Sequence, residues 1–182
     1  MLTVSRRQVF QATVLSGLAA ACSKFSLAEA QPEGDALSIM SSDPRFSDWV
    51  QVLRYAGLAQ YAQSGPKFTS FVPTNDAFQK YPEILQDVLR PRNKAFPDTT
   101  LQVQFVRSHV ILDEHPLSEF AGKKVQLTAI SGNPIDIDAT QPGVYVVSWS
   151  GIPGKIATTT ITGNPIAATN GIIYPFNEIT IS

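Results

Sequence analysis

One short segment, residues 68–78, constrains the fold of this chain more than any other. Its first half has the spacing of a buried strand, and Pro73 ends that strand because proline has no backbone N–H to donate to a sheet. Thr74, Asn75 and Asp76 follow at once, and their side-chain oxygens can accept from the free N–H groups of a helix start. The segment therefore predicts a strand, a turn and a helix whose N-cap is Thr74.

The rest of the chain has helical patterns in its first half and strand patterns in its second half. Apolar residues recur at helical spacing over 46–62 with a break near Gly57, over 78–89, and from Thr99 or Thr100 to His109. Alternating and β-branched residues predict a hairpin and further strands at 125–130, 135–138, 144–149, 156–161, 172–176 and 179–181. This order predicts an α+β fold, with an antiparallel sheet structure and helices packed at one side.

Two segments resemble signature boxes of the fasciclin domain family. Residues 68–78 resemble the first box, and residues 168–174 resemble the second, with Tyr174 where histidine is common. The resemblance covers 46–182 and implies a single fasciclin domain over 45–182, an antiparallel β-sandwich or wedge with helices at one side. It also implies a structural role for Thr74, Asn75, Asp76, Asn170 and Gly171. At residues 169–171 the sequence itself predicts a tight turn with a positive φ, which asparagine and glycine tolerate.

The first 30 residues are expected to be a signal peptide that is removed on export. Arg6 and Arg7 precede a short apolar run and resemble a Tat signal, with an ordinary Sec signal as the alternative. The single cysteine, Cys22, lies in this leader, and we expect its removal rather than its lipidation. Residues 31–44 are polar and small and are expected to form a linker. The mature protein is then periplasmic or secreted.

The composition argues against several classes of function. A hydrophobic fraction of 43% fits a globular domain with a core, and a net charge of −1 offers no electrostatic surface for nucleic acid. A mature chain without cysteine has no disulfide and no thiolate chemistry. The apolar run of the leader is too short to span a bilayer, and we expect no transmembrane segment in the mature chain. The spacing of its polar residues matches no familiar catalytic motif, so we expect no enzyme, no cofactor and no metal.

Two imidazoles and two carboxylates lie within residues 109–115, and they are the candidate binding residues: His109, Asp113, Glu114 and His115. Residues 109–111 resemble a fasciclin element to which integrin recognition is attributed, although Ser108 replaces its usual tyrosine. The resemblance therefore makes the loop 112–118 the candidate contact surface. The same residue types could hold a divalent metal, and His109 could instead be a core histidine bonded to the backbone.

These observations leave more than one function open. The first is a non-enzymatic adhesion or interaction module that binds a surface, matrix or macromolecular partner, which is what the resemblance implies. The second is a carrier of a hydrophobic small molecule such as a carotenoid, because some fasciclin-like proteins bind such pigments. Its lining would come from aromatic residues that could equally belong to the core: Trp49, Tyr55, Tyr61, Tyr145 and Trp149. A metalloprotein that uses the 109–115 cluster is a third.

Overall fold

Two four-stranded sheets and a group of helices form the part of the chain that the computed structural model describes, residues 34–82, 100–149, 157–161 and 163–179. The helical elements of this part are α1 Ala36–Ser42, the 3-10 helix η1 Pro44–Phe46, α2 Ser47–Tyr55, α3 Ala59–Ser64, α4 Asn75–Lys80, α6 Thr100–Ser108 and the 3-10 helix η2 Leu117–Glu119. The strands are β1 Phe68–Pro73, β2 Val110–Leu112, β3 Lys124–Thr128, β4 Pro134–Asp138, β5 Val146–Trp149, β6 Ala157–Thr160, β7 Ile166–Ala168 and β8 Gly171–Phe176.

The first sheet has the strand order β2-β1-β8-β7 and the second has the order β3-β4-β5-β6. All neighbouring strands are antiparallel except β1 and β8, which run parallel with Phe68 opposite Gly171. The α+β prediction is confirmed, and the expectation of a purely antiparallel structure is corrected for this one pair. A parallel pair needs a long connection, and here the chain from α4 to β7 lies between the two strands.

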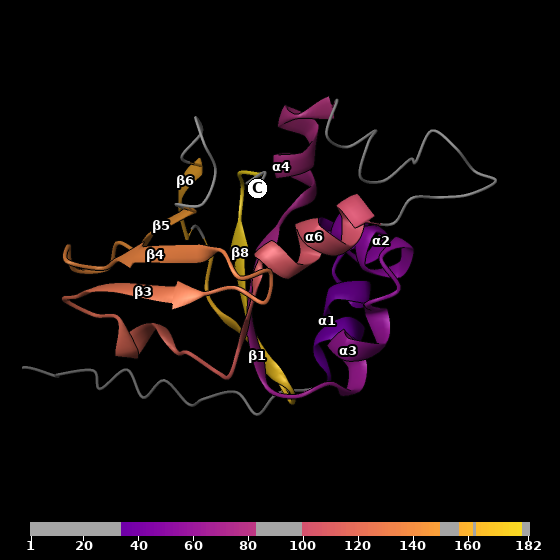
Figure 1. Ribbon diagram of the computed structural model, residues 1–182, viewed down its shortest axis with the longest axis horizontal. Coiled ribbons are helices and arrows are strands. Elements are labelled where there is room, and N and C mark those ends of the chain that lie inside the picture. The colour runs from indigo at the N-terminus through magenta and orange to yellow at the C-terminus, as the bar shows by residue number, and fades with distance from the viewer. Residues whose placement is uncertain (1–33, 83–99, 150–156, 162, 180–182) are drawn as a thin grey trace, which may run out of the picture.

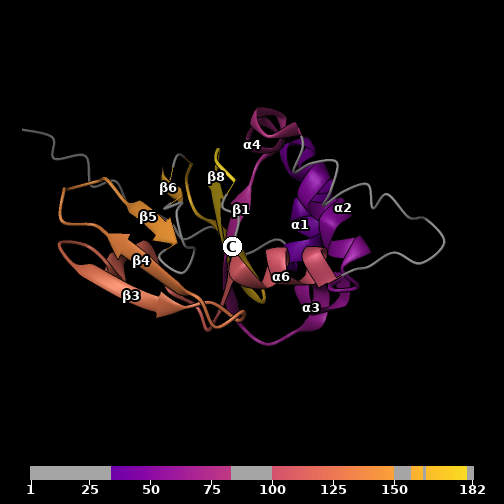
Figure 2. The same cartoon turned by 45° about the horizontal axis from the view of Figure 1, so that its top comes forward.

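The first sheet lies between the helices and the second sheet (Figures 1 and 2). Side chains alternate across a strand, so the two faces of this sheet fill two different cores. Val72 and Ile173 pack with Trp49 and the other helix residues, whereas Phe71 and Tyr174 pack against the second sheet. The expected placement of the helices at one side of the sheets is therefore confirmed.

The prediction of a linker at residues 31–44 is wrong for residues 36–42, because these residues form α1. Asp35 caps this helix, because its carboxylate accepts from the Ser38 N–H at 2.8 Å. Ala36 and Met40 are buried in the helical core, so α1 belongs to the domain. The small polar residues of the segment hid this short apolar stripe at helical spacing.

The break near Gly57 is confirmed, since α2 ends at Tyr55, α3 begins at Ala59 and Gly57 has a φ of 68°. The expected signal peptide lies outside the described residues, as does most of the helix expected over 78–89 beyond the end of α4 at Lys80. Residues 177–179 are not a strand, and 180–181 lie outside the described part.

Gly171 is required for a close approach of two strands and not for a positive φ, which corrects the expected turn geometry. Neither Asn170 nor Gly171 has a positive φ, but a Cβ built on Gly171 would lie 2.5 Å from the Phe68 carbonyl oxygen. We expect Gly171→Ala to reduce the free energy of unfolding by about 1–3 kcal/mol, because β1 and β8 must separate. Urea denaturation measures the change. Gly163→Ala is the control, since its Cβ would meet only ordinary contacts with Pro175, and an equal loss in both variants would contradict the prediction.

Candidate functional site

The structure separates His109 from the other residues of the candidate binding cluster. His109 lies at the end of α6 with 0% exposure, among the rings of Trp49, Phe105, Trp149 and Phe176 at centroid distances of 4.6–5.8 Å. A buried ring offers no atom to a partner at the surface, so the expectation that His109 contacts a partner is corrected. The sequence also allowed His109 to be a core histidine that is hydrogen-bonded to the backbone, and the structure agrees with that interpretation.

A backbone carbonyl determines which ring nitrogen of His109 carries a proton. Its Nδ1 lies 2.7 Å from the Phe105 carbonyl oxygen, which can only accept, so Nδ1 donates. Burial lowers the pKa of His109 to about 4, and the hydrogen bond to Phe105 opposes part of that shift. His109 is thus neutral at physiological pH and fills the junction between α6 and the two sheets.

Asp113, Glu114 and His115 lie together in the loop after β2, and hydrogen bonds to neighbouring elements hold this loop in place. Asp113 has a φ of 68°, and its N–H donates to the Lys67 carbonyl at 3.0 Å. The Thr69 hydroxyl donates to the Asp113 carbonyl at 2.9 Å and accepts from the His115 N–H at 2.8 Å. Glu114 pairs with Lys67 at 2.8 Å. The loop is therefore anchored to the start of β1.

Tyr174 completes the anchoring of this loop. Its hydroxyl donates to the His115 carbonyl at 2.7 Å, while its ring stacks on Phe71 at 5.5 Å. Burial raises the pKa of Tyr174, so the phenol keeps its donating proton at physiological pH. Sequence reasoning missed this role, although Tyr174 was visible as a departure from the family pattern.

In the described part of the chain, metal-ligating side chains do not gather into a cluster that could bind an ion. No group of three or more histidine, cysteine, aspartate or glutamate side chains there could share an ion. His115 instead faces Glu119, with Nδ1 to Oε2 at 3.2 Å, and His109 lies in the core.

The residues of the first box hold elements together, though not as the turn chemistry predicts. Thr74 is the N-cap residue of α4, but its side chain makes no capping hydrogen bond. Asn75 reaches the start of α2 instead: its Oδ1 accepts from the Asp48 N–H at 3.1 Å, and its Nδ2 donates to the Pro44 carbonyl at 2.8 Å. Asp76 is exposed in the first turn of α4. Asn75 therefore joins two helices, and Thr74 does not cap by its hydroxyl.

Asn170 makes the corresponding connection in the second box. It is buried, its Oδ1 accepts from the Ala36 N–H at 2.9 Å, and its Nδ2 donates to the Ala62 carbonyl at 3.0 Å. One side chain thus ties the turn before β8 to the N-terminus of α1 and to α3. These two hydrogen bonds are a physical basis for the structural role that the resemblance implies for Asn170.

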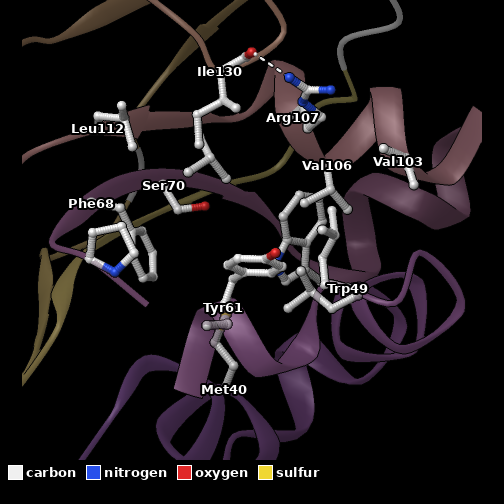
Figure 3. A pocket seen from close by; sticks show the side chains of 15 residues that line it. Met40, Trp49, Tyr61, Phe68, Ser70, Val103, Val106, Arg107, Leu112 and Ile130 are labelled. Atoms are coloured by element: carbon white, nitrogen blue, oxygen red, sulfur yellow. Dashed lines mark hydrogen bonds between the residues drawn. The ribbon is translucent and has the colours of Figure 1, made fainter. Parts of the chain in front are cut away.

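An apolar groove of about 450 Å³ opens between the helices and the first sheet (Figure 3). Of the aromatic residues considered for a carrier, Trp49 and Tyr61 line it, whereas Trp149 packs between the two sheets. Tyr55 is exposed on α2, and Tyr145 packs at the edge of the core between the sheets; neither lines the groove. The sequence analysis missed two polar residues that also line the groove, Ser70 and Arg107.

Comparisons with known proteins agree on one family. The model of the fasciclin domain matches residues 44–181. The transforming growth factor-beta-induced protein ig-h3 of Sus scrofa is 27% identical over 153 residues, which are 81% of this chain and 19% of that protein. The uncharacterized protein sll1735 of Synechocystis sp. is 31% identical over 151 residues, 79% of this chain and 94% of that protein.

A solved structure has the same fold. The pair of FAS1 domains from the insect cell adhesion molecule fasciclin I superposes with a TM-score of 0.66 at 20% identity, over 83% of this chain and 52% of that chain. This chain therefore corresponds to one part of the longer proteins ig-h3 and fasciclin I. No helix in the described residues combines the length and apolar character needed to cross a membrane.

Proposed function

Because the chain belongs to the fasciclin domain family, we propose that it is an exported, non-enzymatic interaction domain that binds a surface, matrix or macromolecular partner. Fasciclin domains serve as cell-adhesion and interaction modules, as in the adhesion molecule fasciclin I. We place this protein outside the cytoplasm, in the periplasm or secreted, after removal of residues 1–30 as a Tat-like signal peptide and of Cys22 with them.

The anchored loop at residues 113–116 is the observation that carries this proposal. Hydrogen bonds from Thr69, Tyr174 and Lys67 fix its backbone and Glu114. Binding residues concentrate on loops that a rigid scaffold positions, and a loop already fixed in one conformation loses little entropy when it binds. We assign the contact surface to Asp113, Glu114 and His115, without His109.

We expect the double substitution Asp113→Asn and Glu114→Gln to weaken partner binding about 2- to 10-fold, as fits the loss of the exposed charge of Asp113 and of the half-buried charge of Glu114. Asparagine tolerates the positive φ of residue 113, so the loop keeps its shape. The measurement is binding of the purified protein to washed cells of the producing organism and to their extracellular polysaccharide. Asp76→Asn is the control, since Asp76 is exposed on α4 away from this loop.

Unchanged binding of the double variant, with an unchanged circular dichroism spectrum, would remove the loop from the contact surface. Failure of the unsubstituted protein to bind either preparation would contradict the interaction function itself.

The apolar groove favours a second candidate function, the carriage of an apolar small molecule. Its volume of about 450 Å³ lies within the range of ligand pockets in proteins. Native mass spectrometry and an absorbance spectrum of the protein purified from its own organism test this function: a bound apolar compound or visible colour would support it.

A further inference from the structure

The lining of the apolar groove contains one charged residue, Arg107, among its described members. Arg107 lies in the last turn of α6 and is half buried. Its Nη2 donates to the Ile130 carbonyl at 3.2 Å, and no carboxylate forms an ion pair with it in the part of the chain that the structure describes. A guanidinium has five N–H donors in a planar fork that matches a carboxylate, so Arg107 keeps donors available for a ligand.

Ser70 is a second polar group that faces the groove. Its side chain is 2% exposed, and it lies on the same face of β1 as Phe68 and Val72, which pack toward the helices. Its hydroxyl can both donate and accept, so it offers a polar contact to a ligand in the groove that the side chain lines.

A short series of backbone contacts connects Ser70 with Arg107. Ser70 is the register partner of Val110 in the β1–β2 pair. The Val110 carbonyl accepts from the Ile130 N–H at 2.8 Å, and the Ile130 carbonyl accepts from Arg107. Figure 3 shows Arg107 and Ile130 on the opposite side of the groove from Met40. Arg107 therefore lies across the groove from Met40 (Figure 3).

Several apolar side chains that line the groove are exposed to solvent. Tyr61 is 65% exposed, Leu112 54% and Ile130 37%, and all three line the groove. Exposed apolar side chains gathered in one patch mark a binding site more often than scattered ones do. A ligand with an apolar body would cover them.

We propose that this groove binds a long-chain carboxylic acid, with the carboxylate on Arg107 and the hydrocarbon chain directed toward Met40. The inference rests on the second candidate function and specifies its ligand class. The single cation of the lining matches a ligand with one negative charge, and the continuous apolar groove matches a ligand with one hydrocarbon chain. A neutral apolar molecule would leave the guanidinium without a charged partner as it covered the groove, which costs binding free energy. A membrane surface would need several cations rather than one.

The test compares an acid with its neutral ester. The full chain is freed of lipid by solvent extraction, and the fluorescence of the neutral dye Nile red then reports occupation of the groove. Dodecanoic acid and methyl dodecanoate compete with the dye in the unsubstituted protein, in Arg107→Gln and in Arg54→Gln. Arg54 is an exposed arginine on α2 that does not line the groove.

We expect Arg107→Gln to weaken binding of the acid about 10- to 100-fold, as fits the loss of a charged hydrogen bond, and to leave the ester unchanged. Arg54→Gln is expected to change neither. Arg107→Lys retains the charge, so it is expected to keep a preference for the acid even if Arg107→Gln does not fold.

Three outcomes overturn the proposal. Equal weakening of acid and ester by Arg107→Gln would show that Arg107 does not hold a carboxylate. Binding of Nile red and the ester without binding of the acid would end this inference and leave the carrier function standing. Failure of the dye, the acid and the ester alike to bind would contradict both.

Discussion

Replacement of Asn170 by alanine is expected to lower the free energy of unfolding by about 2–5 kcal/mol. The substitution removes the acceptor for the Ala36 N–H and the donor to the Ala62 carbonyl, which now lie at 2.9 and 3.0 Å from the Asn170 side chain. A buried polar group left without a partner costs roughly 1–3 kcal/mol. This substitution leaves two such groups unpaired, the Ala36 N–H and the Ala62 carbonyl. Thermal or urea denaturation, followed by circular dichroism, measures the loss.

Two further variants separate the hydrogen bonds from the size of the side chain. Asn170→Asp keeps an acceptor for the Ala36 N–H but cannot donate to the Ala62 carbonyl, so it is also expected to destabilise the domain. Asn164→Ala is the control, because Asn164 is exposed. If Asn170→Ala and Asn164→Ala unfold at the same urea concentration, the connection through Asn170 does not stabilise the domain.

Acidification from pH 7 to pH 4 is expected to cost the domain roughly 3 kcal/mol through His109 alone. Burial lowers the pKa of His109 to about 4 in the folded protein, whereas an unfolded chain has a histidine pKa near 6.5. Below about pH 6.5 the unfolded state therefore binds a proton that the folded state excludes, so stability is full above that pH and falls as the pH drops toward 4.

The variant His109→Phe isolates this effect. Phenylalanine fits an aromatic environment and cannot titrate, and the Phe105 carbonyl still accepts from the Ser108 hydroxyl at 2.7 Å. We expect urea denaturation between pH 7 and pH 4 to show a steeper loss of stability for the unsubstituted protein than for the variant. Parallel loss in both would mean that His109 is not the group that excludes the proton. Carboxylates with lowered pKa values, such as Asp138 at about 2, titrate in both proteins and cancel in the comparison.

Local patterns in the sequence predicted most elements of the fold. Residues 68–78 predicted β1 and α4, because proline and the residues of a turn act on backbone atoms next to them in the chain. Alternation predicted the β3–β4 hairpin for the same reason. The helix α1 was missed, since a short apolar stripe among small polar residues gains its stability from packing against distant elements.

The candidate site could be predicted less well. His109 and His115 are close in the sequence, but His109 follows α6 directly and lies in the core, while His115 lies in the anchored loop. Their sequence spacing therefore says nothing of their exposure. Asn75 looked like a cap for its own helix and instead accepts from the N–H of Asp48 in α2. Asn75 has the acceptor chemistry that the sequence indicates, but its partner lies in another helix.

The sequence by itself determined the α+β fold class, the approximate positions of many elements, and the family to which the domain belongs. Only the tertiary structure decided that β1 and β8 run parallel, that Gly171 must lack a Cβ, and that Ser70 and Arg107 both line an apolar groove. The physical reason is the range of the interactions: turns and caps act between chain neighbours, whereas burial, strand order and the pairing of polar groups depend on residues far apart in the chain.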